Sequence, residues 1–329
     1  MRYHAASFRT ALCALACALT VSALADAQTN DADGRDWFER MGKAVETLNY
    51  RGTMVHSHNG QLDTLEVVHQ FKEGKVFERV TSLNGSGREV IRKGDDVRCT
   101  YTDRKQVFVD WASDESPLNA VLPLYDRSLE KHYRFDLQND SGRVAGRKVH
   151  TVNIRPLDEF RYGYRLQVDA ETAMPLKCEL IGDDQRSIEQ VMFTSIDFET
   201  PLSADAFAPL LPTTNFEEVS ATPANPNLVD VSEASWQASQ LPDGFALTVV
   251  TRHGDNQTGA EHLVYTDGVA TISVFAERRR ENIEVIEGAA HIGAANAFGR
   301  QFEDFQITVV GEVPTATVEL VGKSVRPAR

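Results

Sequence analysis

Long hydrophobic runs are missing from this chain of 329 residues, and the longest one stands near its start. The apolar run from Ala11 to Ala25 spans about 15 residues, short of the roughly 20 that a membrane-crossing helix needs. Arg2 and Arg9 precede it, and the small-x-small triplet Ala25-Asp26-Ala27 follows it. This is the pattern of a cleaved leader. We predict a secretory signal peptide over 1–27, cleavage after Ala27 and an exported, soluble mature chain.

Positive charge is scarce. The chain has 34 Lys and Arg against 48 Asp and Glu, a formal net charge of −14. Loss of the leader, with two arginines and one aspartate, makes it −15. Such a chain repels nucleic acid, which we exclude as a partner. The one dense basic run is Arg278-Arg279-Arg280, a candidate for binding lipid phosphate or an acidic partner. The alternative is a solvated loop whose arginines pair with nearby glutamates.

Cysteine is rare in the mature chain. Only Cys99 and Cys178 remain after the leader is removed, in an oxidising compartment where a pair can close. A disulfide requires a short distance between the two Cα atoms, and the sequence does not give that distance. A disulfide and two separate thiols therefore both stay open.

Motifs of catalysis are also lacking. Gly322-Lys323-Ser324 looks like the end of a phosphate-binding loop, but Thr317 stands where that loop requires glycine. The segment Asn84-Gly85-Ser86-Gly87 does not have the frame of a serine nucleophile. We predict that the protein is not an enzyme and has no catalytic site and no cofactor.

Three histidines are the only start of a metal site. His56 and His58 would point to one face of a strand, and His69 lies on the next strand. No further ligand at a suitable spacing completes the set, and polar residues are ordinary at the end of a hairpin. We therefore predict no metal site and keep a metal-dependent hydrolase as a rival hypothesis.

The length of the chain favours two domains, because about 300 mature residues exceed the usual size of a domain with one hydrophobic core. Apolar residues at helical spacing predict a helix over Asp36–Leu48 with Asp36 as its N-cap. Alternating strands and turns then predict an antiparallel meander with one solvated face. With a helical cover near Pro117–Leu129, about ten strands curl around one or two helices up to Leu211.

A proline-containing segment separates this domain from the next. Residues 212–230, with little apolar periodicity, are the predicted linker, and 231–329 form a small α+β domain. Its helix is predicted over Thr315–Val321, opened by Pro314. Its strands are predicted at Phe245–Arg252, His262–Asp267, Val269–Ala276, near Ala289–Phe298 and at Phe305–Val310.

An aromatic and arginine run in the first domain is a candidate interface. Over 160–165, we expect one strand with Phe160, Tyr162 and Tyr164 on one face and Arg161 and Arg165 on the other. The alternative is that the aromatics form the inner face of a curved sheet.

Six segments, in order along both domains, resemble the RseB/MucB family of sigma-E regulatory proteins. They are 49–53 (NYRGT), 82–92 (SLNGSGREVIR), 161–176 (RYGYRLQVDAETAMPL), 241–245 (LPDGF), 261–275 (EHLVYTDGVATISVF) and 305–317 (FQITVVGEVPTAT). The resemblance implies an α+β fold: a LolA/LolB-like open antiparallel half-barrel with covering helices over 28–211, and a small C-terminal domain that binds the anti-sigma factor.

By the same resemblance, the protein works in the periplasm. It would bind the periplasmic part of an anti-sigma factor of the RseA or MucA type and shield it from site-one proteolysis. A lipid signal such as lipopolysaccharide would release it by linkage. Arg161, Tyr162, Tyr164, Arg278, Arg279 and Arg280 are candidates for partner or head-group contacts. Candidates for the lipid pocket, with ordinary core packing as the alternative, are Val55, Phe71, Phe77, Phe108, Trp111, Leu122 and Tyr125.

One binding function competes with the regulator. The first domain alone would suit a periplasmic lipid or lipoprotein carrier, but the second domain matches the regulator. Whether the chain forms a homo-oligomer, and which lipid acts as the signal, are left open by the sequence.

Overall fold

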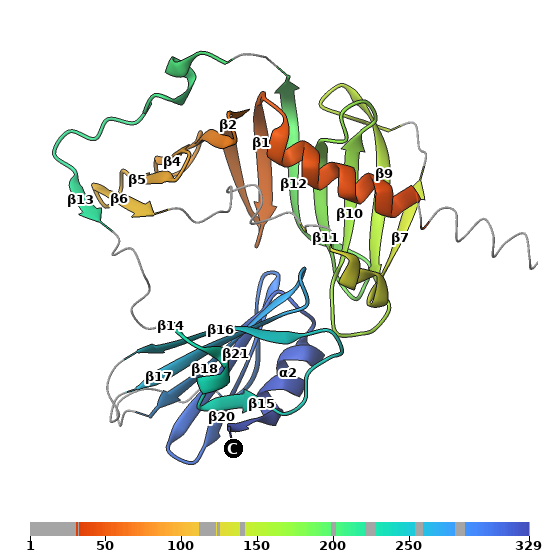
Figure 1. Cartoon of the computed structure of the whole chain (residues 1–329), viewed down its shortest axis with the longest axis vertical. Helices are drawn as coiled ribbons and strands as arrows, with labels where there is room; N and C mark the ends of the chain where they lie inside the picture. Colours follow the sequence, from red (N-terminus) through yellow and green to blue (C-terminus); the bar gives the residue numbers. More distant parts are fainter. Residues whose placement is uncertain are drawn as a thin grey trace, which may run out of the picture.

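The chain folds into two sheet domains (Figure 1), seen in a computed structural model that describes residues 31, 33–111, 123, 126–138, 142–198, 202–220, 228–253, 259–279 and 287–328. The predicted signal peptide and its cleavage site lie outside these residues. Within them, no helix combines the length and apolar character needed to cross a membrane.

The first domain is one open sheet in the order β13-β6-β5-β4-β3-β2-β1-β12-β11-β10-β9-β7. Two meanders, β1 to β6 and β7 to β12, join where β1 pairs antiparallel with β12. The turns are of the kind that the sequence predicts: Asn59 and Gly60 both have positive φ, as a tight hairpin requires. The strands are β1 Tyr50–His58, β2 Gln61–Lys72, β3 Lys75–Ser82, β4 Arg88–Lys93, β5 Asp96–Tyr101, β6 Gln106–Trp111, β7 Tyr133–Gln138, β8 Arg143–Val144, β9 Arg147–Pro156, β10 Gly163–Asp169, β11 Pro175–Ile181, β12 Ser187–Asp197 and β13 Glu217–Ser220.

An N-terminal helix covers one face of this sheet, which we call the helix side (Figure 1). Residues 33–47 are helical, so Asp36 lies within the helix and its prediction as N-cap is wrong. The predicted apolar face is confirmed, because Met41 and Val45 are buried in the main core of the domain. Phe38 is fully buried on the same helix, and its ring stacks on that of Phe135 at 5.7 Å.

Most of the cover predicted near Pro117–Leu129 lies outside the described residues. The end of it forms a 3-10 helix, η1, over Arg127–Lys131, where Asp126 accepts a hydrogen bond from the Ser128 N–H at 2.8 Å. Leu129 on this turn is fully buried in the main core.

The predicted linker is not free of regular structure. β13 pairs in parallel with β6, so residues 217–220 belong to the first sheet. Just before it, η2 (Ala204–Phe207) places Phe207 against Val68 on the face opposite the helix side. The strand Glu-Glu-Val-Ser is polar and lies at a sheet edge, so it carries no alternation that the sequence could reveal.

The second domain is a sheet in the order β14-β16-β17-β18-β21-β20-β19, with α2 packed on it. The helix α2 (Thr315–Ser324) is confirmed after Pro314 and runs three residues beyond its predicted end. The single strand predicted near Ala289–Phe298 is wrong, because Gly293, with φ of +64°, turns the chain between β19 and β20. The remaining elements are β14 Leu228–Val229, η3 Val231–Glu233, β15 Trp236–Ala238, β16 Ala246–His253, β17 Ala260–Thr266, β18 Thr271–Arg278, β19 Gly288–Ile292, β20 Ala295–Phe302, β21 Phe305–Gly311 and β22 Val325–Pro327.

These two sheets confirm the predicted fold class, an open half-barrel with a covering helix and a small α+β domain. The open cysteine question is also decided. Cys99 lies on β5 and Cys178 on β11, and five strands stand between them in the sheet. Since neighbouring strands are about 4.8 Å apart, the two thiols do not form a disulfide with each other.

Candidate functional site

The two domains meet around the buried side chain of Arg161. Its Nη1 donates to Asp267 Oδ2 at 2.8 Å, and both side chains are 0% exposed. Its Nε donates to Asp158 Oδ2 at 3.1 Å, and its Nη2 donates to the carbonyl oxygen of Asp243. Because Asp267 and Asp243 belong to the second domain, one guanidinium joins residues of both domains.

Tyr133 completes this contact from the first domain. Its hydroxyl donates to Asp267 Oδ2 at 3.1 Å, and Arg161 lies over its ring. Burial, and then the charge of Asp267, raise the pKa of Tyr133, so its hydroxyl remains a donor. Asp267 also accepts the N–H groups of Val269 and Ala270, at 2.9 and 2.8 Å. All the acceptor capacity of this carboxylate is therefore used inside the junction.

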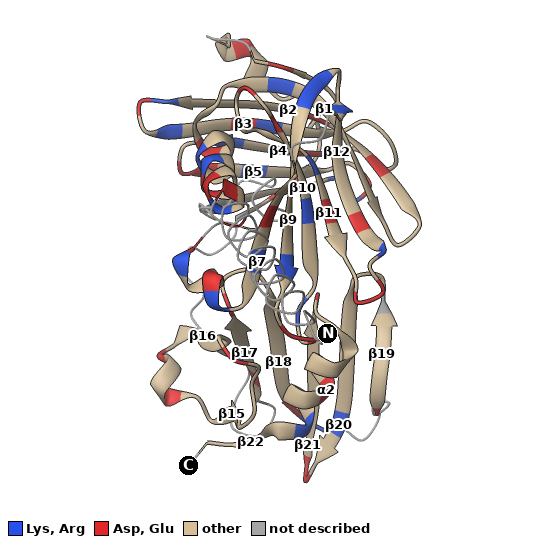
Figure 2. Ribbon diagram, turned by 90° about the vertical axis from the view of Figure 1, so that its right-hand side faces the viewer, with Lys and Arg blue, Asp and Glu red and all other residues tan. Residues whose placement is uncertain are grey.

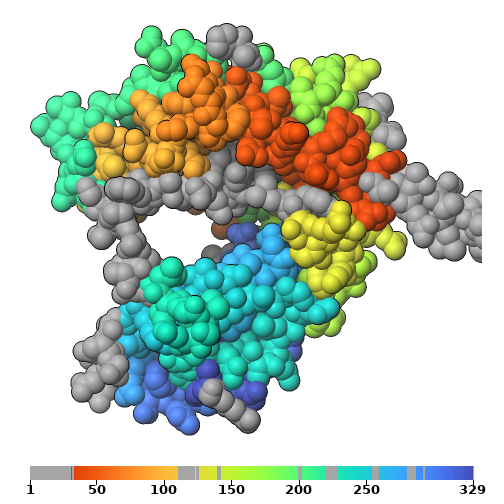
Figure 3. All heavy atoms as spheres, viewed as in Figure 1, coloured from red at the N-terminus to blue at the C-terminus, as the bar shows by residue number. Residues whose placement is uncertain are grey.

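Further contacts lie beside this ion pair. Asn296 Nδ2 donates to the Tyr162 hydroxyl at 2.9 Å, and the Thr317 hydroxyl donates to the Phe160 carbonyl oxygen at 2.7 Å. In Figure 3, the first domain (yellow, around η1) lies directly against the blue-green second domain on one side of the molecule. A Cβ atom on Gly268 would lie 3.6 Å from Leu129 of η1. The junction therefore combines buried polar contacts with an apolar cluster of Tyr162, Leu180 and Ala294.

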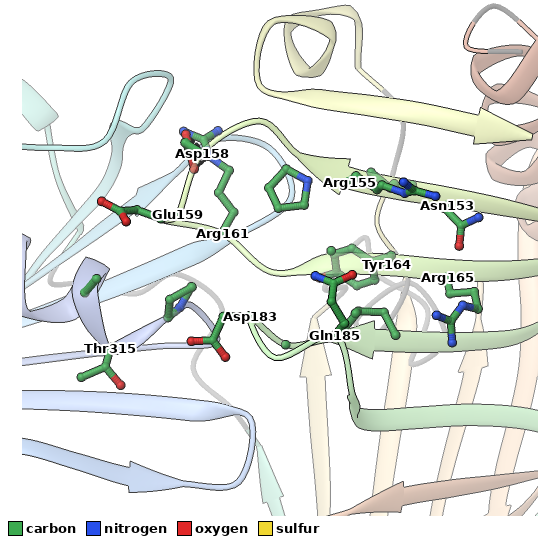
Figure 4. A pocket seen from close by; sticks show the side chains of 17 residues that line it. Asn153, Arg155, Asp158, Glu159, Arg161, Tyr164, Arg165, Asp183, Gln185 and Thr315 are labelled. Atoms are coloured by element: carbon green, nitrogen blue, oxygen red, sulfur yellow. Dashed lines mark hydrogen bonds and ion pairs between the residues drawn. The ribbon is translucent and has the colours of Figure 1, made fainter. Parts of the chain in front are cut away.

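A cleft of about 670 Å³ opens at this junction. Figure 4 shows Arg155 and Arg165 on the strands of the first domain, with Asp183 nearer to Thr315 at the start of α2. Arg155 is 60% exposed and pairs with Asp136 at 3.1 Å, and Arg165 is 42% exposed. Charges of both signs line the cleft, which suits a polar, extended ligand better than an apolar one.

The predicted aromatic and arginine run differs from expectation. β10 begins only at Gly163, so residues 160–162 are not part of a strand, and 160–161 lie in a bend. Arg161 and Tyr162 are buried in the junction, and Tyr164 lies on the helix side of β10. Their role as partner contacts stays a prediction. No sequence signal identified Asp243 or Asn296. Asp267 ends a predicted strand, and its side chain caps the turn that follows.

The other basic candidates lie at the far end of β18. Arg278 and Arg279 are exposed, and Arg278 lies over the Phe305 ring at 5.4 Å. Arg280 lies outside the described residues. Figure 2 shows charges of both signs spread over the strands and turns of both domains.

The lipid-pocket candidates do not share one face. Register places Phe71 and Phe108 on the helix side, and both are half-buried. Val55 and Phe77 lie on the opposite face, where Phe77 packs near Phe207 at 6.1 Å. The side chain of Trp111, and Leu122 and Tyr125 entirely, lie outside what the structure describes.

His69 is not part of a cluster with His56 and His58. Its Nδ1 donates to the Leu48 carbonyl oxygen at 2.8 Å, and its ring stacks on Tyr50 at 5.1 Å in the core. Nor does Cys178 suit nucleophilic chemistry: burial, followed by Glu179 and Glu189, raises the pKa of its thiol to about 12, so the thiol stays protonated.

We expect His69 to make the fold sensitive to acid. Burial, and to a lesser extent Arg92, lower the pKa of His69 below its usual 6.5, while the bond to Leu48 opposes this. The unfolded chain therefore binds the proton first, and stability falls as the pH drops below about 6.5 toward the lowered folded pKa, by at most about 1.4 kcal/mol per pH unit. Urea unfolding at several pH values measures this slope.

A matched pair of variants isolates this effect. His69→Gln should flatten the decline in unfolding free energy between neutral and mildly acidic pH. His291→Gln, which removes an exposed imidazole, should show the same decline of unfolding free energy with pH as the parent chain. Equal slopes in the parent and His69→Gln would contradict the assignment.

Comparison with known proteins follows the two-domain division. The family model of the MucB/RseB N-terminal domain matches residues 33–211, and that of the MucB/RseB C-terminal domain matches 230–326. The sigma factor AlgU regulatory protein MucB of Pseudomonas aeruginosa is 29% identical over 319 residues, covering 93% of this chain and 95% of its own.

Solved structures indicate the same family. MucB in the MucA/MucB complex of Pseudomonas aeruginosa superposes with a TM-score of 0.71 at 28% identity, covering 90% of this chain and 99% of its own. A crystal structure of MucB superposes with a TM-score of 0.60 at 27% identity, covering 90% of this chain and 98% of its own. The chain belongs to the MucB/RseB family.

Proposed function

We propose that this chain is a periplasmic regulator of an envelope-stress sigma factor that binds the periplasmic part of a membrane-bound anti-sigma factor of the MucA or RseA type. While bound, it shields that segment from site-one proteolysis, and a lipid such as lipopolysaccharide releases it. The observation that carries the proposal is the match of both domains, in one superposition, to MucB of the MucA/MucB complex.

The arrangement of the domains supports binding at the junction. The TM-score is higher for MucB in the complex, 0.71, than for the crystal structure of MucB, 0.60, at nearly the same identity and coverage. The polar cleft lined by Arg155, Arg165 and Asp183 lies between the domains. We propose that a segment of the anti-sigma factor contacts this cleft, and that the angle between the domains tunes its affinity.

Lipid release would follow from linkage. A lipid that binds the free form better than the complex weakens the complex by the same factor. The helix side of β4 to β6 offers half-buried apolar side chains, among them Val90, Val97 and Phe108. We propose this surface for the acyl chain, with Phe71 as a further contact.

The test is calorimetric titration of the mature chain, residues 28–329, with the periplasmic segment of the host anti-sigma factor, with and without lipopolysaccharide. We expect binding that lipopolysaccharide weakens. Arg165→Glu places an acidic charge in the cleft and should weaken binding about 10-fold, or about 1.4 kcal/mol. Arg104→Glu, in an exposed turn between β5 and β6, is the matched charge reversal and should bind like the parent.

Two outcomes would change the proposal. Equal loss of binding in both variants would mean that net charge matters and the cleft does not. Absence of binding at micromolar concentrations, together with co-purified lipid, would favour the lipid or lipoprotein carrier.

A further inference from the structure

Two histidines and two carboxylates converge on the helix side of three neighbouring strands. His56 and His58 lie on β1, with rings stacked at 4.4 Å and 6° between their planes. Asp63 stands opposite His56 on β2, and Glu189 lies on β12, which flanks β1 on its other side. Single ligand atoms of His56, His58 and Asp63 all lie within 4.8 Å of one another.

One polar atom in this cluster has no hydrogen-bond partner within the described residues. His58 Nδ1 is buried from solvent, and Asp63 Oδ2 lies 3.8 Å away, too far for a hydrogen bond. A buried polar atom left in this way calls for an explanation, such as an ion or a water. Two ligands of one tetrahedral zinc, each about 2.1 Å from the metal, are separated by about 3.4 Å. The 3.8 Å between His58 Nδ1 and Asp63 Oδ2 is close to this ligand separation.

Glu189 provides a carboxylate that can accept a hydrogen bond from the second ring nitrogen of a metal-bound histidine. It accepts a hydrogen bond from His56 Nε2 at 2.5 Å. Histidines that bind zinc commonly donate their other ring nitrogen to a carboxylate, which fixes the orientation of the ring. In this cluster Glu189 either orients His56 or turns to become a further ligand.

The cluster carries an excess of negative charge. Glu312 of the second domain also lies near Glu189 and His56. Asp63 and Glu189 place two carboxylates beside the two imidazoles. Such a surplus favours a dication, and imidazole with carboxylate suits zinc.

We propose that His56, His58 and Asp63, supported by Glu189, form a binding site for a divalent transition-metal ion such as zinc. The site lies where the domains touch. The tip of the same hairpin abuts the β19–β20 turn, because a Cβ atom on Gly293 would lie 1.3 Å from Asn59 Oδ1. A bound dication lowers the repulsion between the acidic groups of this region, so it stabilises the docked arrangement of the domains.

The experiment uses the mature chain after chelator treatment, titrated with Co²⁺ and then Zn²⁺. We expect one equivalent of Co²⁺ to produce visible absorption bands of a nitrogen and oxygen site, Zn²⁺ to displace it, and Zn²⁺ to raise the thermal midpoint. His56→Gln/His58→Gln should lose all three responses. The double variant His253→Gln/His262→Gln, which removes two neighbouring imidazoles of the second domain, should keep them.

A second variant protects the test against misfolding. Asp63 is 46% exposed, so Asp63→Asn leaves the fold intact and should weaken zinc binding about 10-fold or more. The proposal is overturned if the parent chain binds no Co²⁺ at micromolar concentrations. It is equally overturned if the folded His56→Gln/His58→Gln or Asp63→Asn variants bind Zn²⁺ like the parent.

Discussion

Replacing Arg161 with alanine is expected to separate the two domains. The guanidinium is fully buried between Asp158 and Asp267, and its loss leaves the carboxylate of Asp267, also 0% exposed, without its cation. Breaking a buried ion pair from one side costs about 3–5 kcal/mol. The domains keep their own cores, so this cost falls on their docking and not on the fold of either one.

Small-angle scattering and calorimetry measure this outcome. We expect a larger radius of gyration for Arg161→Ala and two thermal transitions in place of a joint one. Arg155→Ala is the matched control, because it removes an exposed arginine from its pair with Asp136, worth about 0–1 kcal/mol. An unchanged radius and a single transition in Arg161→Ala would show that other contacts hold the junction.

Replacing Phe38 with alanine is expected to weaken the first domain severely. Its ring is fully buried and stacks on Phe135, which joins the N-terminal helix to β7. Truncation leaves a cavity that this tightly packed layer cannot close, at a cost of about 3–5 kcal/mol. Urea unfolding measures the loss of free energy, and the midpoint should fall with an unchanged slope.

The neighbouring residue offers the control. Glu39 is exposed on the outer face of the same helix. Glu39→Ala should change the unfolding free energy by no more than about 0.5 kcal/mol. A loss of less than about 1 kcal/mol in Phe38→Ala would mean that the helix contributes little to the core.

Both variants also bear on function. If the domain junction sets the geometry of the partner cleft, Arg161→Ala should weaken binding of the anti-sigma segment, because this variant undocks the domains on either side of the cleft. Phe38→Ala acts on the covering helix, none of whose described residues line the cleft. Comparing the two separates loss of domain geometry from general loss of stability.

Local sequence patterns predicted the elements whose periodicity is strong. Met41 and Val45 marked the apolar face of the N-terminal helix, and Pro314 marked the start of α2. The patterns failed where the local signal was weak. β13 is short and polar, and the turn at Gly293 stands within a run of small residues, so neither shows alternation before the partner strand is known.

Contacts between residues far apart in the chain could not be predicted from the sequence. Arg161 and Asp267 are 106 positions apart, and only packing of one domain on the other brings them into contact. In the same way, Glu189 on β12 bonds to His56 on β1 across 133 positions of the chain. From the sequence we predicted no metal site because no further ligand stood at a suitable spacing, whereas the hairpin register brings Asp63 opposite His56 and the sheet order adds Glu189.

The sequence by itself determined the two domains, the meanders, the covering helix and the family, because local periodicity, turn residues and a set of ordered segments are all written along the chain. The tertiary structure decided which polar residues are buried between the domains, which face of the sheet each candidate occupies and that the two cysteines lie apart. Those properties depend on strand order and on domain docking. Both are determined by the summed free energy of contacts between residues far apart in the chain.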